Sequence, residues 1–323
     1  MPNDCQIKTS IMKHRIFFTY AILVLIAFVS CKDKKSTEVI DKPKEAEKEL
    51  KTLDVNDYSF HYIDIGEGEP LIFVHGSIGD YRAWEAQIDT FATKYRVIVP
   101  SRRYAWPNTQ PVSDTLDYSA GQHAKDLALI IKKLNLEPAH LVGHSWGGYT
   151  VLKTAVDHPE LVQSMVLGEP AAATLIMGTK EGDSLMGDFY QNALAPAAKN
   201  FTENRPEDAI RSFVGGVMGD TAYFDTVPQV MRDIWMQNTA ETEGSSITDG
   251  FTPISPDEVA RLEIPTLLIQ GEKSPDLFIK IVDTLHARLP NSTLYELPNA
   301  SHGLQLENPK EFNKAVLQFL NGL

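Results

Sequence analysis

The stretch Gly143-His-Ser-Trp-Gly147, in which a serine stands between two glycines, restricts the fold of this chain more than any other feature. The mainly apolar residues 139–142 before it predict a short buried strand, and residues 149–156 after it predict a helix that ends before Pro159. A strand that passes so abruptly into a helix holds the residue between them in a strained conformation and needs small neighbours. The spacing therefore predicts a tight turn with the Ser145 hydroxyl exposed at its apex.

Length and composition indicate that this turn belongs to a globular protein. The chain has 323 residues, of which 43% are hydrophobic, which is enough for one large α/β domain with an insertion or for two domains. Its net charge of −13 argues against nucleic acid as a partner. Because the sequence has no metal-ligand cluster, P-loop or dinucleotide-binding fingerprint, we expect neither a metal nor a cofactor.

The first 52 residues have the pattern of a targeting signal followed by a linker. Basic residues within 13–15 precede an apolar run over 16–29, which is shorter than the roughly 20 residues of a membrane span and typical of a secretory signal. The end of this run, Phe28-Val-Ser-Cys31, resembles a bacterial lipobox. The resemblance implies a lipoprotein-type signal peptide over residues 1–30, acylation of Cys31, and a lipid bilayer of the bacterial cell envelope as a partner. A plain cleaved signal or an uncleaved anchor is the alternative.

Two further observations agree with an exported, lipid-attached chain. Cys5 and Cys31 are the only cysteines, and Cys5 would be removed with the signal, so no disulfide can form in the mature chain. Residues 31–52 are charged and poor in aromatic side chains, which predicts a flexible tether. Met12, which directly precedes the basic residues, is an alternative start of translation to Met1.

A second motif precedes Ser145 along the chain. The apolar run 70–74 predicts a strand that is covered on both faces, and it ends in His75-Gly-Ser77. Together, His-Gly after one strand and Gly-x-Ser-x-Gly after a later one resemble the α/β-hydrolase family. This resemblance implies a mostly parallel central sheet flanked by helices, with a helical cap inserted over the active site. It also implies an oxyanion hole formed by the backbone N–H groups of Ser77 and Trp146, with His75 ordering the loop.

The resemblance also indicates the base that activates Ser145, since a serine hydroxyl is a poor nucleophile until a base takes its proton. His302 follows the last predicted strand, residues 293–297, which is where α/β hydrolases place their catalytic histidine. Five other histidines lie in or beside predicted elements and are poorer candidates: His123, His140, His144, His158 and His286.

The acid that would orient this histidine is harder to place. Many family members carry it in a G-x-x-D pattern after the strand that corresponds to residues 264–270, but here Ser274 occupies that position. Some branches of the superfamily, including certain haloalkane dehalogenases, carry the acid one strand earlier. That arrangement favours Glu169, which ends the preceding predicted strand. Asp276 is the fallback acid, and Glu272 is a third candidate.

Residues 171–262 lack a parallel-strand pattern and contain three helical stretches, over 185–201, 206–217 and 227–236. By the family resemblance they form the cap, while residues 53–170 and 263–323 form the α/β-hydrolase core. The methionine and aromatic side chains of this segment either line an apolar acyl or aryl pocket or make up a small core of the cap itself. These side chains are Met177, Met186, Met218, Met231, Met236, Phe189, Tyr190, Tyr223, Phe224 and Trp235.

The serine at the turn selects the class of reaction. Haloalkane dehalogenases and epoxide hydrolases of this fold use an aspartate there, a chemistry that Ser145 cannot perform. We therefore expect a serine hydrolase that cleaves an ester of a small-molecule acyl substrate, in the manner of a carboxylesterase. A lactonase, amidase, C–C bond hydrolase or perhydrolase would use the same residues, and a non-catalytic, surface-tethered binding scaffold is an alternative of another class. Arg102 and Arg103 either anchor loops by pairing with acidic neighbours or meet an anionic substrate group.

Overall fold

A computed structural model describes residues 48–248 and 250–323, and their strands form one eight-stranded sheet. The strands are β1 (Lys51–Val55), β2 (Tyr58–Ile65), β3 (Glu69–Val74), β4 (Tyr95–Pro100), β5 (Ala139–His144), β6 (Val162–Gly168), β7 (Thr266–Gly271) and β8 (Ser292–Leu297). Their order in the sheet is β1-β2-β4-β3-β5-β6-β7-β8. Strand β2 is antiparallel to β1 and β4, and all other neighbours are parallel. The predicted α/β fold with a mostly parallel sheet is therefore confirmed.

Of the N-terminal segment predicted as signal and tether, only residues 48–52 are among those that the structure describes. The signal predicted over residues 1–30, and the tether as far as residue 47, lie outside the described residues. Strand β1 begins at Lys51, and its first two residues pair with Tyr62 and His61 of β2. The last two residues assigned to the tether therefore belong to the sheet. No helix of the described residues is long and apolar enough to cross a membrane.

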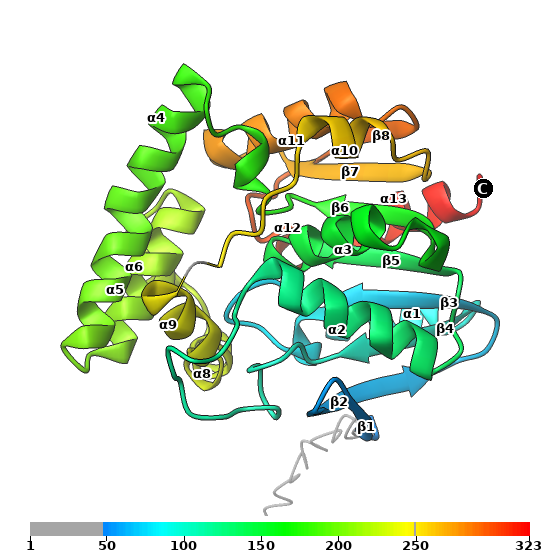
Figure 1. The fold of residues 1–323 in the computed structure, drawn as a ribbon, viewed down its shortest axis with the longest axis horizontal. Coiled ribbons are helices and arrows are strands. Elements are labelled where there is room, and N and C mark those ends of the chain that lie inside the picture. The colour runs from blue at the N-terminus through cyan, green and yellow to red at the C-terminus, as the bar shows by residue number, and fades with distance from the viewer. Residues whose placement is uncertain (1–47, 249) are drawn as a thin grey trace, which may run out of the picture. The chain divides into compact units, whose positions relative to one another are not determined.

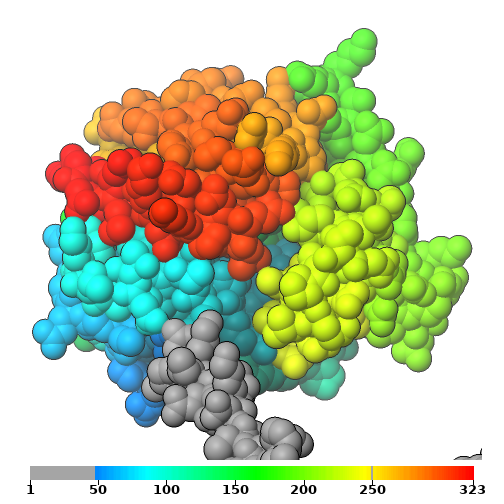
Figure 2. Space-filling model, turned by 180° about the vertical axis from the view of Figure 1, so that it is seen from behind, coloured from blue at the N-terminus to red at the C-terminus, as the bar shows by residue number. Residues whose placement is uncertain are grey.

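Helices cover both faces of the sheet because its central strands are apolar on both sides. In β3, Ile72 and Val74 pack toward one face, while Leu71 and Phe73 pack toward the other. The first face carries α2 (Ala120–Lys133), α3 (Trp146–Asp157), α10 (Pro256–Ala260) and α11 (Asp276–Arg288) (Figure 1). The second carries α1 (Glu85–Phe91), α12 (Leu304–Glu307) and α13 (Pro309–Leu320), and Figure 2 shows α13 in red beside the cyan region that contains α1.

The described residues between β6 and β7 form helices joined by turns and loops, with no strand among them, and most of them gather at one side of the sheet (Figure 1). It contains α4 (Lys180–Phe189), a π-helical turn η4 (Tyr190–Leu194), α5 (Ala195–Thr202), α6 (Pro206–Met218), α7 (Tyr223–Thr226), α8 (Gln229–Gln237) and α9 (Ala240–Ile247). Ile210, Val214 and Phe224 form a small core of these helices with Ile78. Both ends of the segment, including α10, instead pack into the core beneath. Short 3₁₀ turns complete the chain: η1 (Tyr81–Trp84), η2 (Pro159–Leu161) and η3 (Ala173–Leu175).

Candidate active site

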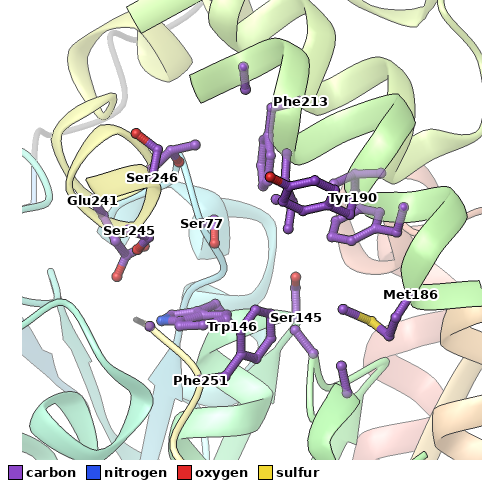
Figure 3. Close-up of a pocket in the computed structure, with 18 of the residues that line it drawn as sticks. Ser77, Ser145, Trp146, Met186, Tyr190, Phe213, Glu241, Ser245, Ser246 and Phe251 are labelled. Atoms are coloured by element: carbon purple, nitrogen blue, oxygen red, sulfur yellow. The ribbon is translucent and has the colours of Figure 1, made fainter. Parts of the chain in front are cut away.

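Ser145 lies in the tight turn between β5 and α3 that the glycine spacing predicts. Its backbone has φ 52° and ψ −119°, a conformation that is costly for a residue with a side chain. The turn closes this tightly because Gly147 has no side chain: a Cβ there would lie 2.2 Å from the carbonyl oxygen of Val74. The Ser145 N–H donates to the Gly168 oxygen at 2.9 Å, which ties the turn to the end of β6. As a result the Ser145 side chain projects away from the sheet and into a cavity (Figure 3).

His302 and Glu169 meet in the interior beside this turn. His302 Nδ1 lies 2.7 Å from Glu169 Oε2, and both side chains are buried. Because a carboxylate only accepts hydrogen bonds, Nδ1 is the donor in this contact, and in the neutral form of the ring Nε2 has the lone pair. Nε2 is buried and has no hydrogen-bond partner among the described residues, and His302 lines a cavity together with Ser145. The structure thus brings together the three residues that the sequence assigns to nucleophile, base and acid.

The other two acids lie elsewhere. Asp276 is exposed at the first residue of α11, and Glu272 is exposed and accepts a hydrogen bond from the Asn299 N–H at 2.7 Å. The segment after β7 does not supply the acid. The end of β7 binds the acid through its backbone, since the Gly271 N–H donates to Glu169 Oε1 at 2.7 Å. That bond and the bond to His302 satisfy both oxygens of the buried Glu169 carboxylate.

Two neighbouring aromatic side chains contact His302, one at its ring and one at its backbone. Phe278 of α11 stacks on it, with ring centroids 3.7 Å apart. His144 Nε2 donates to the His302 carbonyl oxygen at 2.7 Å, and burial lowers the pKa of His144 to about 3, so this ring stays neutral. Sequence motifs revealed neither contact, because both depend on how β5, α11 and the loop after β8 converge.

The loop after β3 lies directly against the serine turn. A Cβ placed on Gly76 would lie 3.1 Å from the Ser145 Cβ, and Ser77 lines both of the cavities that Ser145 lines. Trp146 is the first residue of α3, so its N–H has no acceptor within that helix. The N–H groups of Ser77 and Trp146 are therefore located beside Ser145, where the sequence predicts an oxyanion hole.

His75 orders this loop. Its Nε2 accepts from the Arg102 N–H at 2.9 Å, so Nδ1 carries the proton and donates to the Gly76 oxygen at 2.8 Å. Complete burial, with the nearby Arg102 charge as a second cause, lowers the pKa of His75 to about 3. A ring that is neutral and bonded at both nitrogens has a structural role.

Comparison with known proteins supports the same assignment of fold. A family model described as alpha/beta hydrolase fold matches residues 69–309. The chain belongs to the alpha/beta hydrolase fold family. It is 24% identical over 335 residues to epoxide hydrolase 1 of Caenorhabditis elegans, covering 98% of this chain and 81% of that protein. It is 23% identical over 293 residues to the 2-hydroxy-6-oxo-6-(2'-aminophenyl)hexa-2,4-dienoic acid hydrolase of Metapseudomonas resinovorans, covering 89% and 96%.

Among solved structures, a carboxylesterase of Bacillus subtilis shares the fold, with a TM-score of 0.67 and 21% identity over 86% of this chain and 93% of that chain. These relatives act on chemically different bonds, as their names state, so membership of the hydrolase family leaves the reaction and the substrate of this chain to its own residues.

Two cavities meet at Ser145 in this hydrolase. The first, of about 410 Å³, lies between Trp146, Phe251, α11 and the cap helices, and it contains Met186, Phe189 and Tyr190 of the predicted pocket residues (Figure 3). The second, of about 330 Å³, contains His302 and the remaining pocket residues Met218, Tyr223, Met231 and Trp235. Phe224 is buried in the small core of the cap instead, Met236 packs against that core, and Met177 is exposed.

The two arginines after β4 both anchor loops. Arg102 pairs with Glu241 of α9, and Arg103 binds Asp126 of α2 through two hydrogen bonds of 2.7 Å. Sequence analysis did not identify Glu241, because nothing in its local pattern distinguishes it from a solvated acid of the cap. Within the described residues no cluster of three or more His, Cys, Asp or Glu side chains is arranged to hold a metal.

Proposed function

We propose that this protein is a serine hydrolase that cleaves a carboxylic ester through an acyl-enzyme on Ser145. One observation carries the proposal: Ser145, at a strained turn, shares a cavity with His302, whose Nδ1 is held by Glu169 and whose Nε2 has no hydrogen-bond partner within the described part of the chain. The buried His75, by contrast, has a hydrogen-bond partner at each ring nitrogen.

Each residue then has a defined part in the reaction. Ser145 Oγ attacks the ester carbonyl carbon while His302 Nε2 takes its proton, and the negative carbonyl oxygen receives hydrogen bonds from the Ser77 and Trp146 N–H groups. His302 returns the proton to the alcohol oxygen as the C–O bond breaks. Water, deprotonated by His302, then attacks the acyl-enzyme, and Ser145 leaves with the proton. Glu169 stabilises the imidazolium in both steps without accepting its proton.

The two cavities suggest how an ester lies in this site. His302 must reach the oxygen of the leaving alcohol, and it lines only the second of the two cavities that Ser145 joins. We therefore assign the leaving alcohol to the second cavity and the acyl group to the first. Both walls are mainly apolar, so the substrate class is an ester with apolar groups on both sides of the bond.

Labelling with a fluorophosphonate probe, followed by mass analysis of the modified peptide, tests this proposal directly. We expect the probe on Ser145, and we expect Ser145→Ala to abolish labelling and lower kcat by roughly four orders of magnitude, because the three residues act as a unit. Ser274→Ala is the matched control: Ser274 is also a buried serine near the site, and its loss should leave labelling and turnover intact.

The wild-type protein that reacts with the probe is then assayed with a panel of acyl esters, lactones and amides and for peracid formation. The substrates that it turns over identify the bond that it cleaves. An unlabelled wild-type protein, or a Ser145→Ala variant that keeps a tenth of the activity, would contradict the serine mechanism. Labelling without turnover of any ester, lactone or amide would favour a binding scaffold.

A further inference from the structure

A buried arginine holds the loop that contributes the first oxyanion donor. Arg102 donates from Nε to the His75 oxygen at 2.9 Å and from Nη2 to the Gly76 oxygen at 3.0 Å. Its backbone N–H also donates to the His75 ring, and its side chain is almost completely buried. One residue therefore fixes two consecutive carbonyl groups immediately before Ser77.

The Gly76 carbonyl matters because of the peptide bond that it shares with Ser77. The group Gly76 C=O–N–H Ser77 is a planar trans unit, so its N–H points opposite to its carbonyl. Arg102 Nη2 and His75 Nδ1 bind the oxygen from the core side. Their bonds therefore set the direction in which the Ser77 N–H faces the site.

Arg102 is held in turn by the cap. Glu241 of α9 binds both terminal nitrogens of the guanidinium, at 2.7 Å between Nη2 and Oε2 and by a second contact between Nη1 and Oε1. Although burial opposes the charge, Arg102 and the neighbouring His123 lower the pKa of Glu241 to about 2, so the pair stays ionised. Glu241 also lies in the wall of the first cavity, on the side of Ser77 (Figure 3).

We infer that Glu241 is a positioning residue that couples the seating of the cap to the oxyanion hole through Arg102. This inference depends on the proposed function. When α9 is seated, its carboxylate fixes the guanidinium, which fixes the Gly76–Ser77 peptide plane and hence the Ser77 N–H. Without Glu241 the buried guanidinium loses its countercharge and moves toward other acceptors or water. The Gly76 oxygen then keeps only its bond from His75 Nδ1, and the peptide plane is held less firmly.

The neighbouring pair provides a matched control. Arg103 and Asp126 form an equally buried, two-bond pair at 2.7 Å, but Arg103 contacts the Asn56 oxygen and not the loop after β3. Glu241→Gln and Asp126→Asn each change a carboxylate to an amide of the same size, and each leave one buried arginine without its countercharge. Only the first should disturb the oxyanion hole.

The experiment compares the two variants with wild type in ester turnover and in binding of an apolar trifluoromethyl ketone. Ser145 adds to this ketone, His302 takes the serine proton, and the resulting oxyanion lies where the transition-state oxygen would lie. For Glu241→Gln we expect kcat and the ketone affinity to fall together by roughly 10- to 100-fold, with KM nearly unchanged. This fall is smaller than the one caused by removing an oxyanion-hole donor completely, because the Ser77 N–H is displaced and not deleted. For Asp126→Asn we expect both values within about threefold of wild type. Its unfolding midpoint should nevertheless fall by about as much as that of Glu241→Gln.

Equal losses in the two variants, or a Glu241→Gln variant with wild-type ketone affinity, would overturn the inference and leave the proposed function standing. A wild-type protein that neither binds the ketone nor reacts with a fluorophosphonate would overturn both. If Glu241→Gln does not fold, Glu241→Asp decides: its shorter carboxylate keeps the charge but draws the guanidinium away, so kcat and ketone affinity should again fall together. Unchanged values in that variant would refute the coupling.

Discussion

Glu169 has an unfavourable backbone conformation and an unfavourable, fully buried environment for a carboxylate. It is fully buried, has φ 42°, and lies at the end of β6, where its N–H bonds to the Ile269 oxygen at 3.1 Å. A buried carboxylate is stable there because the Gly271 N–H and the His302 ring each satisfy one of its oxygens. Removing either contact would leave one buried carboxylate oxygen without a partner.

Glu169→Gln therefore tests the acid separately from the nucleophile. The amide can hold His302 in the wrong tautomer and cannot stabilise the imidazolium, so we expect kcat to fall by roughly 10⁴-fold while the protein stays folded. Asp276→Asn is the control and should be nearly neutral, since Asp276 is exposed at the start of α11. Stopped-flow acylation rates and thermal unfolding measure the two effects. A severe loss in Asp276→Asn together with an active Glu169→Gln would reverse the assignment.

The residues of the site differ in how far sequence could predict their placement. Ser145 and His302 follow strands in local patterns, so they could be placed without knowledge of the packing. Glu169 was inferred because Ser274 stands where an acid is common, and the structure brings Glu169 to His302. Glu241 could not be predicted, because no local pattern or family motif links it to Arg102, 139 positions away along the chain.

At the scale of helices and strands, the cap divides the space above Ser145 into two chambers. Helix α4 contributes Met186 to the first cavity, and α8 contributes Met231 to the second. The two methionines are both partly buried and come from different helices of the same insertion. They make a matched pair for testing which chamber holds the acyl group.

Met186→Trp should slow turnover of esters with long acyl groups, in both acylation and deacylation, because the acyl group stays in the first chamber throughout. Met231→Trp should slow only acylation by esters of bulky alcohols, since the alcohol has left before deacylation begins. We expect changes in kcat/KM of roughly 10-fold or more for the excluded group. Pre-steady-state burst kinetics separates the two steps. A Met231→Trp variant with altered deacylation would reverse the assignment of the chambers.

Elements with a strong apolar period were predictable at this scale, and elements defined by their partners were not. The shared face of Leu127, Ile130 and Ile131 predicts an amphipathic helix over residues 118–134, with Ser119 as its cap. This helix is α2, and Ser119 caps it by accepting from the Gln122 N–H at 3.2 Å. Strand β1 was missed because its polar, half-exposed residues are ordered only by pairing with β2. The alternating pattern of residues 58–65 predicts an edge strand there, but β1 pairs with this strand and forms the edge of the sheet instead.

At the scale of the whole molecule, we propose that the chain is exported and attached to a bilayer of the bacterial cell envelope through Cys31. This residue lies outside the described part of the chain, so the proposal depends on the sequence pattern alone. A thioether-linked diacylglycerol together with an N-terminal acyl chain would give stable attachment, because a single chain binds membranes only marginally.

Cys31→Ser should move the protein from the membrane fraction to the soluble fraction, or leave it unprocessed. Cys5→Ser is the control: Cys5 lies within the predicted signal and should have no effect on fractionation or on the mature mass. Membrane fractionation and the mass of the N-terminal peptide measure both outcomes. An unchanged mass and an unchanged distribution in Cys31→Ser would count against lipid attachment.

The Arg102–Glu241 pair has a consequence for how such a protein could acquire a new specificity. Exchanging the cap for that of a relative is an obvious way to alter the two chambers, both in evolution and in engineering. A graft that begins after Pro170 keeps Glu169, but it also replaces α9 and its carboxylate. A donor cap that lacks an acid facing Arg102 would then bring a suitable chamber and a poor catalyst, and a single carboxylate restored at that point should recover the rate. Compatibility of caps would accordingly depend on one buried charge as much as on shape.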